Sequence, residues 1–278
     1  MYMALSPGAL GLKANSLEEA IALAQANGYQ GVEIGIPETA RLVQEHGPEH
    51  VTGLFRAAKV TPAGFGLPVR WNGPEEEWKS GIAELDSLAA AAQAIGCNRT
   101  TTWLMPGSND LPTEENRRYH IERFAPIANV LRKHGCRLGL EFIGPRTIRD
   151  RLQYPFVYKM LDMLELAREI GPNVGLLLDS WHWYTSGGTL EELKTLTNDD
   201  IVYVHVNDAP RGVPLEDHID NKRCLPGATG VIDITGFLRV LADTGYDGPV
   251  TPEPFGNPAS WAADAVRGCF AKAGIVQP

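Results

Sequence analysis

The sequence has few cysteines, and none of them stands in a metal-binding or redox spacing. Its four cysteines, Cys97, Cys136, Cys224 and Cys269, are scattered over 278 residues without a CxxC pair. Widely spaced cysteines of this kind are typical of reduced thiols, not of a disulfide framework or a structural zinc site. We therefore expect four free thiols and a cytoplasmic protein.

Long basic runs and long apolar runs are also missing. The formal net charge is −9, and nucleic-acid affinity depends mainly on clustered Lys and Arg, so a nucleic-acid partner is disfavoured. The N-terminal segment MYMALSPGALG lacks a basic region followed by an apolar core, and we expect no signal peptide. No run reaches the roughly 18 apolar residues of a membrane helix, so we expect no membrane partner.

A glycine-rich phosphate loop is absent after the first expected strand, which disfavours an open nucleotide-binding sheet. Instead, short apolar runs alternate with longer Ala-, Leu- and Glu-rich stretches. Eight strands are expected, at residues 1–10, 31–36, 61–67, 98–105, 137–144, 175–178, 201–208 and 248–255. Eight strand–helix units predict an α/β fold, a (β/α)₈ TIM barrel forming a single domain over residues 1–278.

The helical stretches between these strands carry their own boundary signals. Ser16 followed by Glu19 is typical of a capping box, and Gly28 is expected to end that helix. Further helices are expected from residue 36 to about 59 and over 75–95, 113–135, 155–170, 189–197, 233–245 and the C-terminal stretch.

Polar side chains follow apolar residues at the ends of four successive expected strands: Glu141, Asp179, His205 and Glu253. Barrel enzymes carry their chemistry at the C-terminal ends of the strands, so these side chains should face one barrel mouth. Three carboxylates would repel one another unless a cation lay between them. Three oxygen donors and one imidazole suit Mn²⁺, Co²⁺, Mg²⁺ or Zn²⁺.

The alternative is that the acids form salt bridges inside the barrel with Lys222 or Arg223. The aromatic residues beside the acid at the end of the sixth strand also have two interpretations. Trp181 and Trp183 either supply apolar walls for a sugar ring or simply fill the core.

Four segments in the order LEFIG, VGLLLDSWHW, VYVHVND and VTPEPF resemble the xylose-isomerase-like superfamily of sugar isomerases and epimerases. The similarity is strongest over residues 137–255 and favours the inosose isomerase (2-keto-myo-inositol isomerase) branch and the ketose 3-epimerases. The resemblance implies one divalent cation bound by the four strand-end residues, with no nucleotide cofactor. It also implies that His182 touches a substrate oxygen and that Arg223 reaches the substrate, although RCLPGATGVID is one residue longer than the family's usual turn.

The chemistry implied by the resemblance is proton transfer beside a metal-bound ketone. The cation stabilises an enediolate, and carboxylates remove and return the proton. The sequence therefore predicts a divalent-metal-dependent isomerase or epimerase of a keto-sugar or keto-cyclitol, with Glu141, Glu253 and His182 as catalytic residues. Which glutamate removes the first proton is left open.

Further substrate contacts are expected from Arg223, Trp181, Trp103 and Glu33, where Glu33 either touches substrate or supports another polar group. Residues 208–230 are expected to form a rim loop, in which Gly227 and Gly230 would make a phosphate-accepting turn. A homo-oligomer is compatible with the sequence.

Three other functions were weighed. A lyase on the same scaffold, either 3-dehydroshikimate dehydratase-like or one that eliminates the aglycone of a 3-keto-glycoside, would use the same ligands. An endonuclease-IV-like enzyme needs additional histidines, which the ends of the third and fourth strands (Phe65 and Trp103) lack. A sugar-binding module without activity would not need three carboxylates around a cation.

Overall fold

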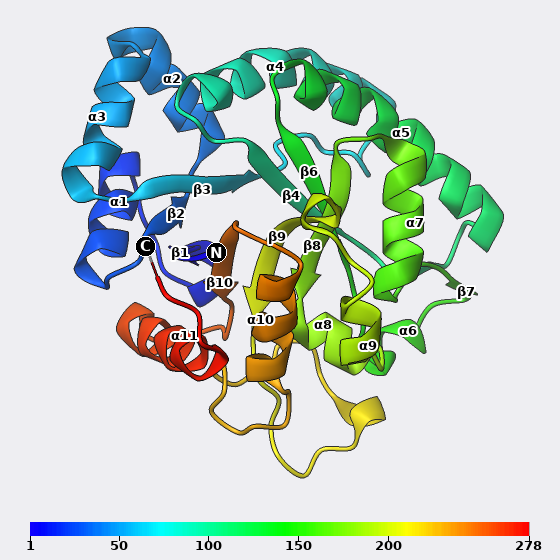
Figure 1. Cartoon of the computed structure of the whole chain (residues 1–278). Coiled ribbons are helices and arrows are strands. Elements are labelled where there is room, and N and C mark those ends of the chain that lie inside the picture. The colour runs from blue at the N-terminus through cyan, green and yellow to red at the C-terminus, as the bar shows by residue number, and fades with distance from the viewer. Residues whose placement is uncertain (278) are drawn as a thin grey trace.

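The centre of the computed structural model, which describes residues 1–277, is a closed sheet of eight parallel strands (Figure 1). The order around the barrel is β1-β10-β9-β8-β6-β4-β3-β2. The strands are β1 (Tyr2–Leu5), β2 (Gly31–Glu33), β3 (Thr61–Gly66), β4 (Arg99–Leu104), β6 (Arg137–Phe142), β8 (Val174–Asp179), β9 (Ile201–Val206) and β10 (Pro249–Pro252). The predicted (β/α)₈ barrel is thus confirmed.

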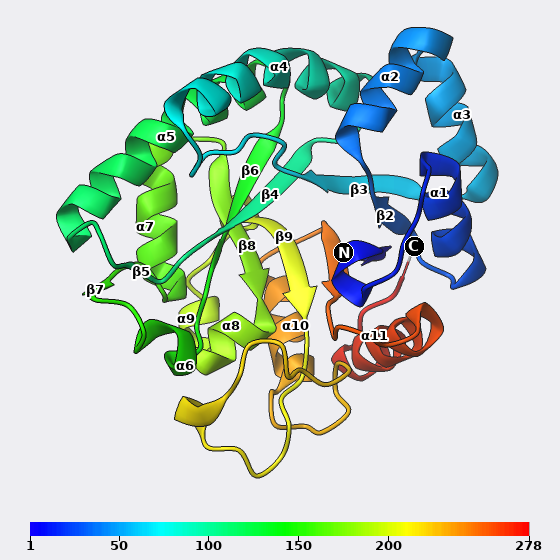
Figure 2. The ribbon, with the colours of Figure 1, turned by 180° about the vertical axis from the view of Figure 1, so that it is seen from behind.

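Helices surround this sheet in both views (Figures 1 and 2). They are α1 (Leu17–Ala26), α2 (Ile36–His46), α3 (Pro48–Ala58), α4 (Glu75–Ala94), α5 (Thr113–Lys133), α6 (Arg146–Arg149), α7 (Met160–Ile170), α8 (Ser180–Thr185), α9 (Leu190–Leu193), α10 (Ile234–Asp243) and α11 (Ala259–Ala273). The C-terminal α11 contacts β1, which closes the helical ring. No helix of residues 1–277 is long and apolar enough to cross a membrane.

The strands β8 and β9 are buried along their whole length. One face packs under helices and the other fills the barrel, which explains the unbroken apolar runs in the sequence. Inside the barrel, Tyr203 packs against Ala4, Ala63 and Leu177. Because alternate residues of a strand share a face, the residue two positions after Tyr203 is the next inward one, at the mouth. That residue is His205.

Three predicted helix boundaries were wrong. The helix expected over 189–197 is the short α9, which ends at Leu193. The stretch expected to be one helix up to residue 59 is two helices, α2 and α3, separated at Gly47, whose φ of 83° interrupts the helical path. The helix expected over 155–170 begins only at Met160, because Tyr154–Pro155 form strand β7 and pair with β5 (Gly107–Ser108). The Ser16 cap was correct: its side chain accepts the Glu19 N–H. All four cysteines are free thiols, as expected.

The long segment between β9 and α10 extends away from the barrel end (yellow to orange in Figure 1). Its base is held by the fully buried Asp208, whose carboxylate accepts four backbone N–H groups. Oδ1 accepts from Ala209 (2.8 Å) and Ile232 (3.0 Å), and Oδ2 accepts from Thr229 (2.9 Å) and Gly230 (2.8 Å). Both ends of the segment are therefore tied to one side chain.

Candidate active site

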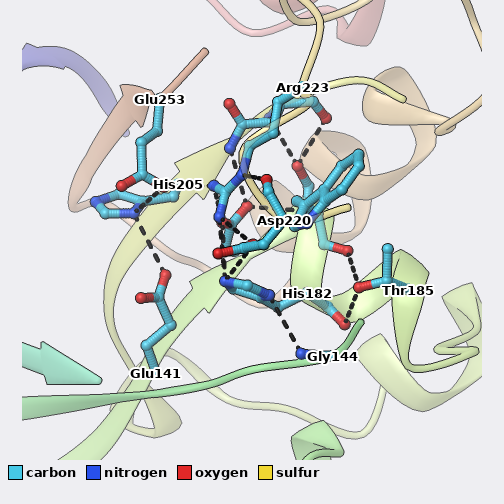
Figure 3. A network of polar contacts seen from close by, with 12 residues as sticks. Glu141, Gly144, His182, Thr185, His205, Asp220, Arg223 and Glu253 are labelled. Carbon is cyan, nitrogen blue, oxygen red and sulfur yellow. Dashed lines mark hydrogen bonds and ion pairs between the residues drawn. The ribbon is translucent and has the colours of Figure 1, made fainter. Parts of the chain in front are cut away.

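The four strand-end residues come together at the barrel mouth. One ligand atom from each of Glu141, Asp179, His205 and Glu253 lies within 4.8 Å of the other three. Glu141, Asp179 and His205 are buried, and the Glu253 side chain is 15% exposed. Figure 3 shows Glu141 and Glu253 on either side of the His205 ring.

Three potential metal-ligand atoms of this group have no hydrogen-bond partner among the described residues. His205 Nδ1 lies 3.5 Å from Glu141 Oε1 and 3.3 Å from Glu253 Oε2, but neither contact has hydrogen-bond geometry. Glu141 Oε1 and both His205 ring nitrogens are buried without a partner. Buried polar atoms ordinarily have a hydrogen-bond partner. Unpaired carboxylate oxygen and imidazole nitrogen atoms that converge on one point are therefore suited to binding a metal ion. The residues present therefore fit a divalent cation.

Burial raises the pKa of Glu141 to about 7, and the charge of Glu253 acts in the same direction. Burial also opposes ionisation of Glu253, but the charges of His205 and Arg223 outweigh it and lower the pKa of Glu253 to about 2. Burial works against the charged form of His205, yet Glu253 and Glu141 hold its pKa well above the usual value. Two glutamates with separated pKa values can serve as proton acceptor and donor in turn.

Arg223 joins the acidic group to the rim segment, and its side chain is 3% exposed. Its Nη1 donates to Asp179 Oδ2 (2.8 Å) and Glu253 Oε2 (2.5 Å), and its Nη2 donates to Asp220 Oδ1 (2.9 Å) (Figure 3). The predicted salt bridge with the strand-end acids is present for Arg223. Lys222 is exposed and takes part in no ion pair among the described residues. The ion pairs with Arg223 and a cation-compatible arrangement of the four strand-end residues therefore occur together. The guanidinium neutralises part of the negative charge on the side of Asp179 and Glu253.

Asp179 is oriented by its neighbours. Its Oδ1 accepts the Trp181 N–H (2.8 Å) and the Asn207 side-chain amide (3.2 Å), which leaves Oδ2 facing Arg223. Asn207 therefore holds the carboxylate at the end of β8.

His182 lies in α8, directly after β8, and burial lowers its pKa to about 3, so the ring is neutral near pH 7. Its Nδ1 accepts the Gly144 N–H (3.2 Å), while its Nε2 lies 3.2 Å from Arg223 Nη2. A neutral imidazole has only one acceptor nitrogen. Because the Gly144 amide is fixed in the backbone, we assign Nδ1 as acceptor. Nε2 then carries the proton, and its 3.2 Å contact to Arg223 Nη2 joins two donors and is not a hydrogen bond.

Gly144 allows this contact because it has no side chain. A β-carbon there would overlap the His182 carbonyl oxygen and the Thr185 hydroxyl. The glycine therefore brings the loop after β6 against α8, and its amide sets the orientation of the histidine (Figure 3).

A pocket of about 270 Å³ opens beside these groups. Its polar lining comprises Glu141, His182, Asp220, Arg223 and Glu253. Its apolar lining comprises Trp103, Met105, Ile143, Ile148 and Phe255. A concave site with a few convergent polar groups and apolar walls is the usual form of a small-molecule site.

The structure places the remaining predicted residues differently. Trp103 lines the pocket, as expected, but Trp181 and Trp183 are 0% and 5% exposed and lie in the core, so the core-filling interpretation holds for both. Trp181 contacts Arg223 instead, with the guanidinium 5.6 Å from the ring. Glu33 ends β2 and lines a separate hollow beside the start of α1. A direct Glu33 contact to substrate in the pocket is therefore not supported.

Amides of the predicted phosphate turn already have hydrogen-bond partners within the chain. Gly230 and its neighbour Thr229 donate their N–H groups to Asp208, so these amides are not free to bind a phosphate. Gly227 has a positive φ of 70°, which suits a turn without requiring a ligand.

Sequence reasoning missed four apolar pocket residues and Gly144. Met105, Ile143 and Ile148 follow β4 and β6 within a few residues, and Phe255 comes two residues after Glu253. Met105, Ile143 and Phe255 fall within the expected strands 98–105, 137–144 and 248–255, so inspecting the apolar residues at the strand ends as well as the polar ones would have found these three.

The chain matches the family model of the xylose isomerase-like TIM barrel over residues 21–272. The chain belongs to this family. It is 23% identical over 248 residues to an inosose isomerase of Bacillus velezensis, a match that covers 88% of this chain and 85% of that protein. It is also 33% identical over 126 residues to a 3-dehydroshikimate dehydratase of Pseudomonas putida, covering 45% of this chain and 19% of that protein.

Solved structures agree with this placement. A xylose isomerase domain protein from Alicyclobacillus acidocaldarius has a TM-score of 0.87 and 30% identity and covers 99% of both chains. The IOLI protein, solved with a bound zinc atom, has a TM-score of 0.75 and 20% identity and covers 99% of this chain and 98% of its own. The similar proteins with named activities are enzymes, whose names include isomerase and dehydratase.

Proposed function

We propose that this protein is a divalent-metal-dependent isomerase or epimerase that acts on a keto-sugar or a keto-cyclitol. The observation that carries the proposal is the convergence of Glu141, Asp179, His205 and Glu253 within 4.8 Å, beside a pocket of small-molecule size. Membership of the xylose isomerase-like family and the similarity to inosose isomerases support it.

Glu141, Asp179, His205 and Glu253 would hold the cation. When bound, it supplies electrostatic stabilisation of the negative charge that develops on substrate oxygens as a carbon-bound proton leaves. Glu141 and Glu253, from β6 and β10, take and return that proton. His182 donates its Nε2–H to a substrate oxygen, and Arg223 holds the substrate from the rim segment.

The test is proton exchange in D₂O, run on the protein purified without chelator and reconstituted with Mn²⁺, Co²⁺, Mg²⁺ or Zn²⁺. A panel of inososes and keto-hexoses is followed by NMR and mass spectrometry, together with elemental analysis. We expect close to one cation per chain, exchange of a proton next to the carbonyl, and products of unchanged mass apart from deuterium. Protein that binds no cation and catalyses no exchange above the uncatalysed rate would rule the proposal out.

A lyase is the second candidate, because the chain is similar over 126 residues to a 3-dehydroshikimate dehydratase. Both reactions begin with proton removal beside a carbonyl, and they differ in whether a group then leaves. Loss of 18 mass units from 3-dehydroshikimate, or release of an aglycone from a 3-keto-glycoside, would assign the lyase reaction instead.

A further inference from the structure

The backbone of Gly144 connects His182 to a side chain of α6. The buried Gly144 donates its N–H to His182 Nδ1 over 3.2 Å (Figure 3). Its carbonyl oxygen accepts Arg149 Nε over 3.0 Å and has no other hydrogen-bond partner among residues 1–277. The same glycine is therefore bound on one side by the histidine and on the other by an arginine.

The peptide that follows Gly144 has little else to fix its orientation. Pro145 supplies no N–H, so the Gly144 carbonyl is the only hydrogen-bonding group of this peptide. Glycine also has the widest backbone freedom of any residue. A buried carbonyl without a partner costs free energy, which favours the orientation in which Arg149 binds it.

Arg149 is held by an aromatic ring and not by an acid. Its guanidinium carbon lies 4.0 Å from the centre of the Tyr158 ring, and both side chains are half-buried. A guanidinium over a ring face is attracted to it, and partial burial strengthens the attraction. Arg149 takes part in no ion pair among the described residues, whereas Arg146 on the same helix pairs with Asp150 at 3.0 Å. The guanidinium of Arg149 is therefore directed to the Gly144 carbonyl.

We propose that Arg149 is a positioning residue for His182. By binding the Gly144 carbonyl, it holds the Gly144 N–H on His182 Nδ1 and so keeps the ring proton on Nε2, the nitrogen beside Arg223 Nη2. Arg149 does not line the pocket, so it acts through the histidine and touches no substrate. The inference rests on the proposed function for the role of His182 in the reaction, but not for the contact itself.

The first test is hydrogen exchange of the Gly144 amide, followed by ¹⁵N-edited NMR on the Zn²⁺-reconstituted full chain. Arg149→Met keeps most of the side-chain length and loses the donor. We expect it to speed exchange of this amide by at least about tenfold, the scale of losing a hydrogen bond to a charged group. The amides of β8 should exchange as in the wild type, which shows that the barrel stays folded.

Two further variants accompany this measurement. Arg149→Lys keeps the charge and can donate from Nζ, so Gly144 should exchange more slowly in it than in Arg149→Met. The matched control is Arg146→Met, which removes a guanidinium that is 57% exposed on the same helix. This control should leave the exchange of Gly144 unchanged. Wild-type exchange of Gly144 in Arg149→Met would overturn the proposal.

The second test is a double-mutant cycle on kcat/KM for proton exchange with the keto-sugar panel. Arg149→Met should lower kcat/KM about tenfold in the wild-type background but less than about twofold in His182→Ala, because its effect passes through the histidine. The same helix also carries Ile148, which lines the pocket, and Thr147, whose Oγ1 donates to the His218 carbonyl on the rim segment. If Arg149 acted through these residues, the loss would be equal in both backgrounds and the proposal would fail.

The two tests separate this inference from the proposed function. A chain that exchanges no substrate proton would remove the proposed function and leave the Gly144 amide to decide whether Arg149 positions the histidine.

Discussion

Glu253 combines two roles that one substitution can separate. Glu253→Gln keeps the shape of the side chain and one oxygen donor but removes its capacity to accept a proton. We expect the metal content to stay close to one per chain, while turnover falls by about 10²–10⁴-fold, the usual effect of losing a general base. The measurement is D₂O exchange alongside elemental analysis. Wild-type exchange in this variant would mean that Glu253 is not an essential base.

The matched comparison is Glu141→Gln, which tests the other glutamate of the pair. Glu141 lies on β6 and Glu253 directly follows β10, so the two substitutions remove proton acceptors on different sides of the site. The variant that abolishes exchange at every pH identifies the group that removes the first proton.

His182 should behave differently from the four ligand residues, because it contacts the site without belonging to the cation-compatible group. We expect His182→Ala to keep its metal. Its kcat/KM should fall by an amount equivalent to about 1–3 kcal/mol, the cost of losing a buried hydrogen bond to the transition state. Loss of metal from purified His182→Ala would instead make His182 a ligand.

The convergence of the four strand-end residues was predictable from sequence because a buried strand rarely ends in an acid or histidine without a partner. Trp181 was not predictable in the same way. A tryptophan beside Asp179 can face the pocket or the core, and the choice depends on how α8 turns after β8, which no local pattern specifies. The apolar walls depend similarly on loop geometry.

Asp208 acts at the scale of a structural element, because one carboxylate anchors both ends of the rim segment. In Asp208→Asn, an amide NH₂ would face two backbone N–H donors in place of a carboxylate oxygen. We expect a stability loss of about 2–4 kcal/mol, from hydrogen bonds to a charged group worth roughly 1.5–3 kcal/mol each. KM should rise as Arg223 loses its fixed position. Urea unfolding and steady-state kinetics measure the two effects.

The control is Asp217→Asn, an exposed acid on the same segment with no side-chain hydrogen bond among the described residues. Asp217→Asn should change neither the stability to urea nor KM. If Asp208→Asn destabilises the fold but leaves KM unchanged, the four hydrogen bonds to Asp208 support the barrel and not the position of Arg223 in the site.

At this scale the sequence predicted the number and order of the barrel strands. It misjudged boundaries where a non-local contact decided them. The helix expected from residue 155 starts five residues later because Pro155 pairs across to Gly107, about 50 residues away in the chain. Gly47 and Pro48, the first residue of α3, were local signals of the break between α2 and α3.

The whole molecule contains a buried histidine outside the pocket that should make its stability depend on pH. His120 packs against Trp71, Phe124 and Phe156, and burial lowers its pKa from 6.5 to about 4. The folded state therefore resists protonation that the unfolded state accepts below pH 6.5. Stability should be complete above pH 6.5 and should fall as the pH drops towards 4, with this histidine contributing roughly 2–3 kcal/mol.

Urea unfolding at several pH values tests this expectation. His120→Phe removes the titrating group and keeps an aromatic ring, so its stability should fall less steeply between pH 6.5 and 4 than that of the wild type. His46→Gln, with a side chain that is 51% exposed, is the control and should follow the wild-type curve. Parallel curves for wild type and His120→Phe would show that other groups carry the acid sensitivity.

The four residues of the cation-compatible group lie at or just beyond the ends of β10, β9, β8 and β6, which are consecutive neighbours around the closed barrel. The other four strands, β4, β3, β2 and β1, form the remaining arc and contribute no ligand to that group. Directed evolution can therefore randomise the loops after these four strands without substituting any residue of the cation-compatible group. A library restricted to that arc would explore new substrates while those four side chains stay unchanged.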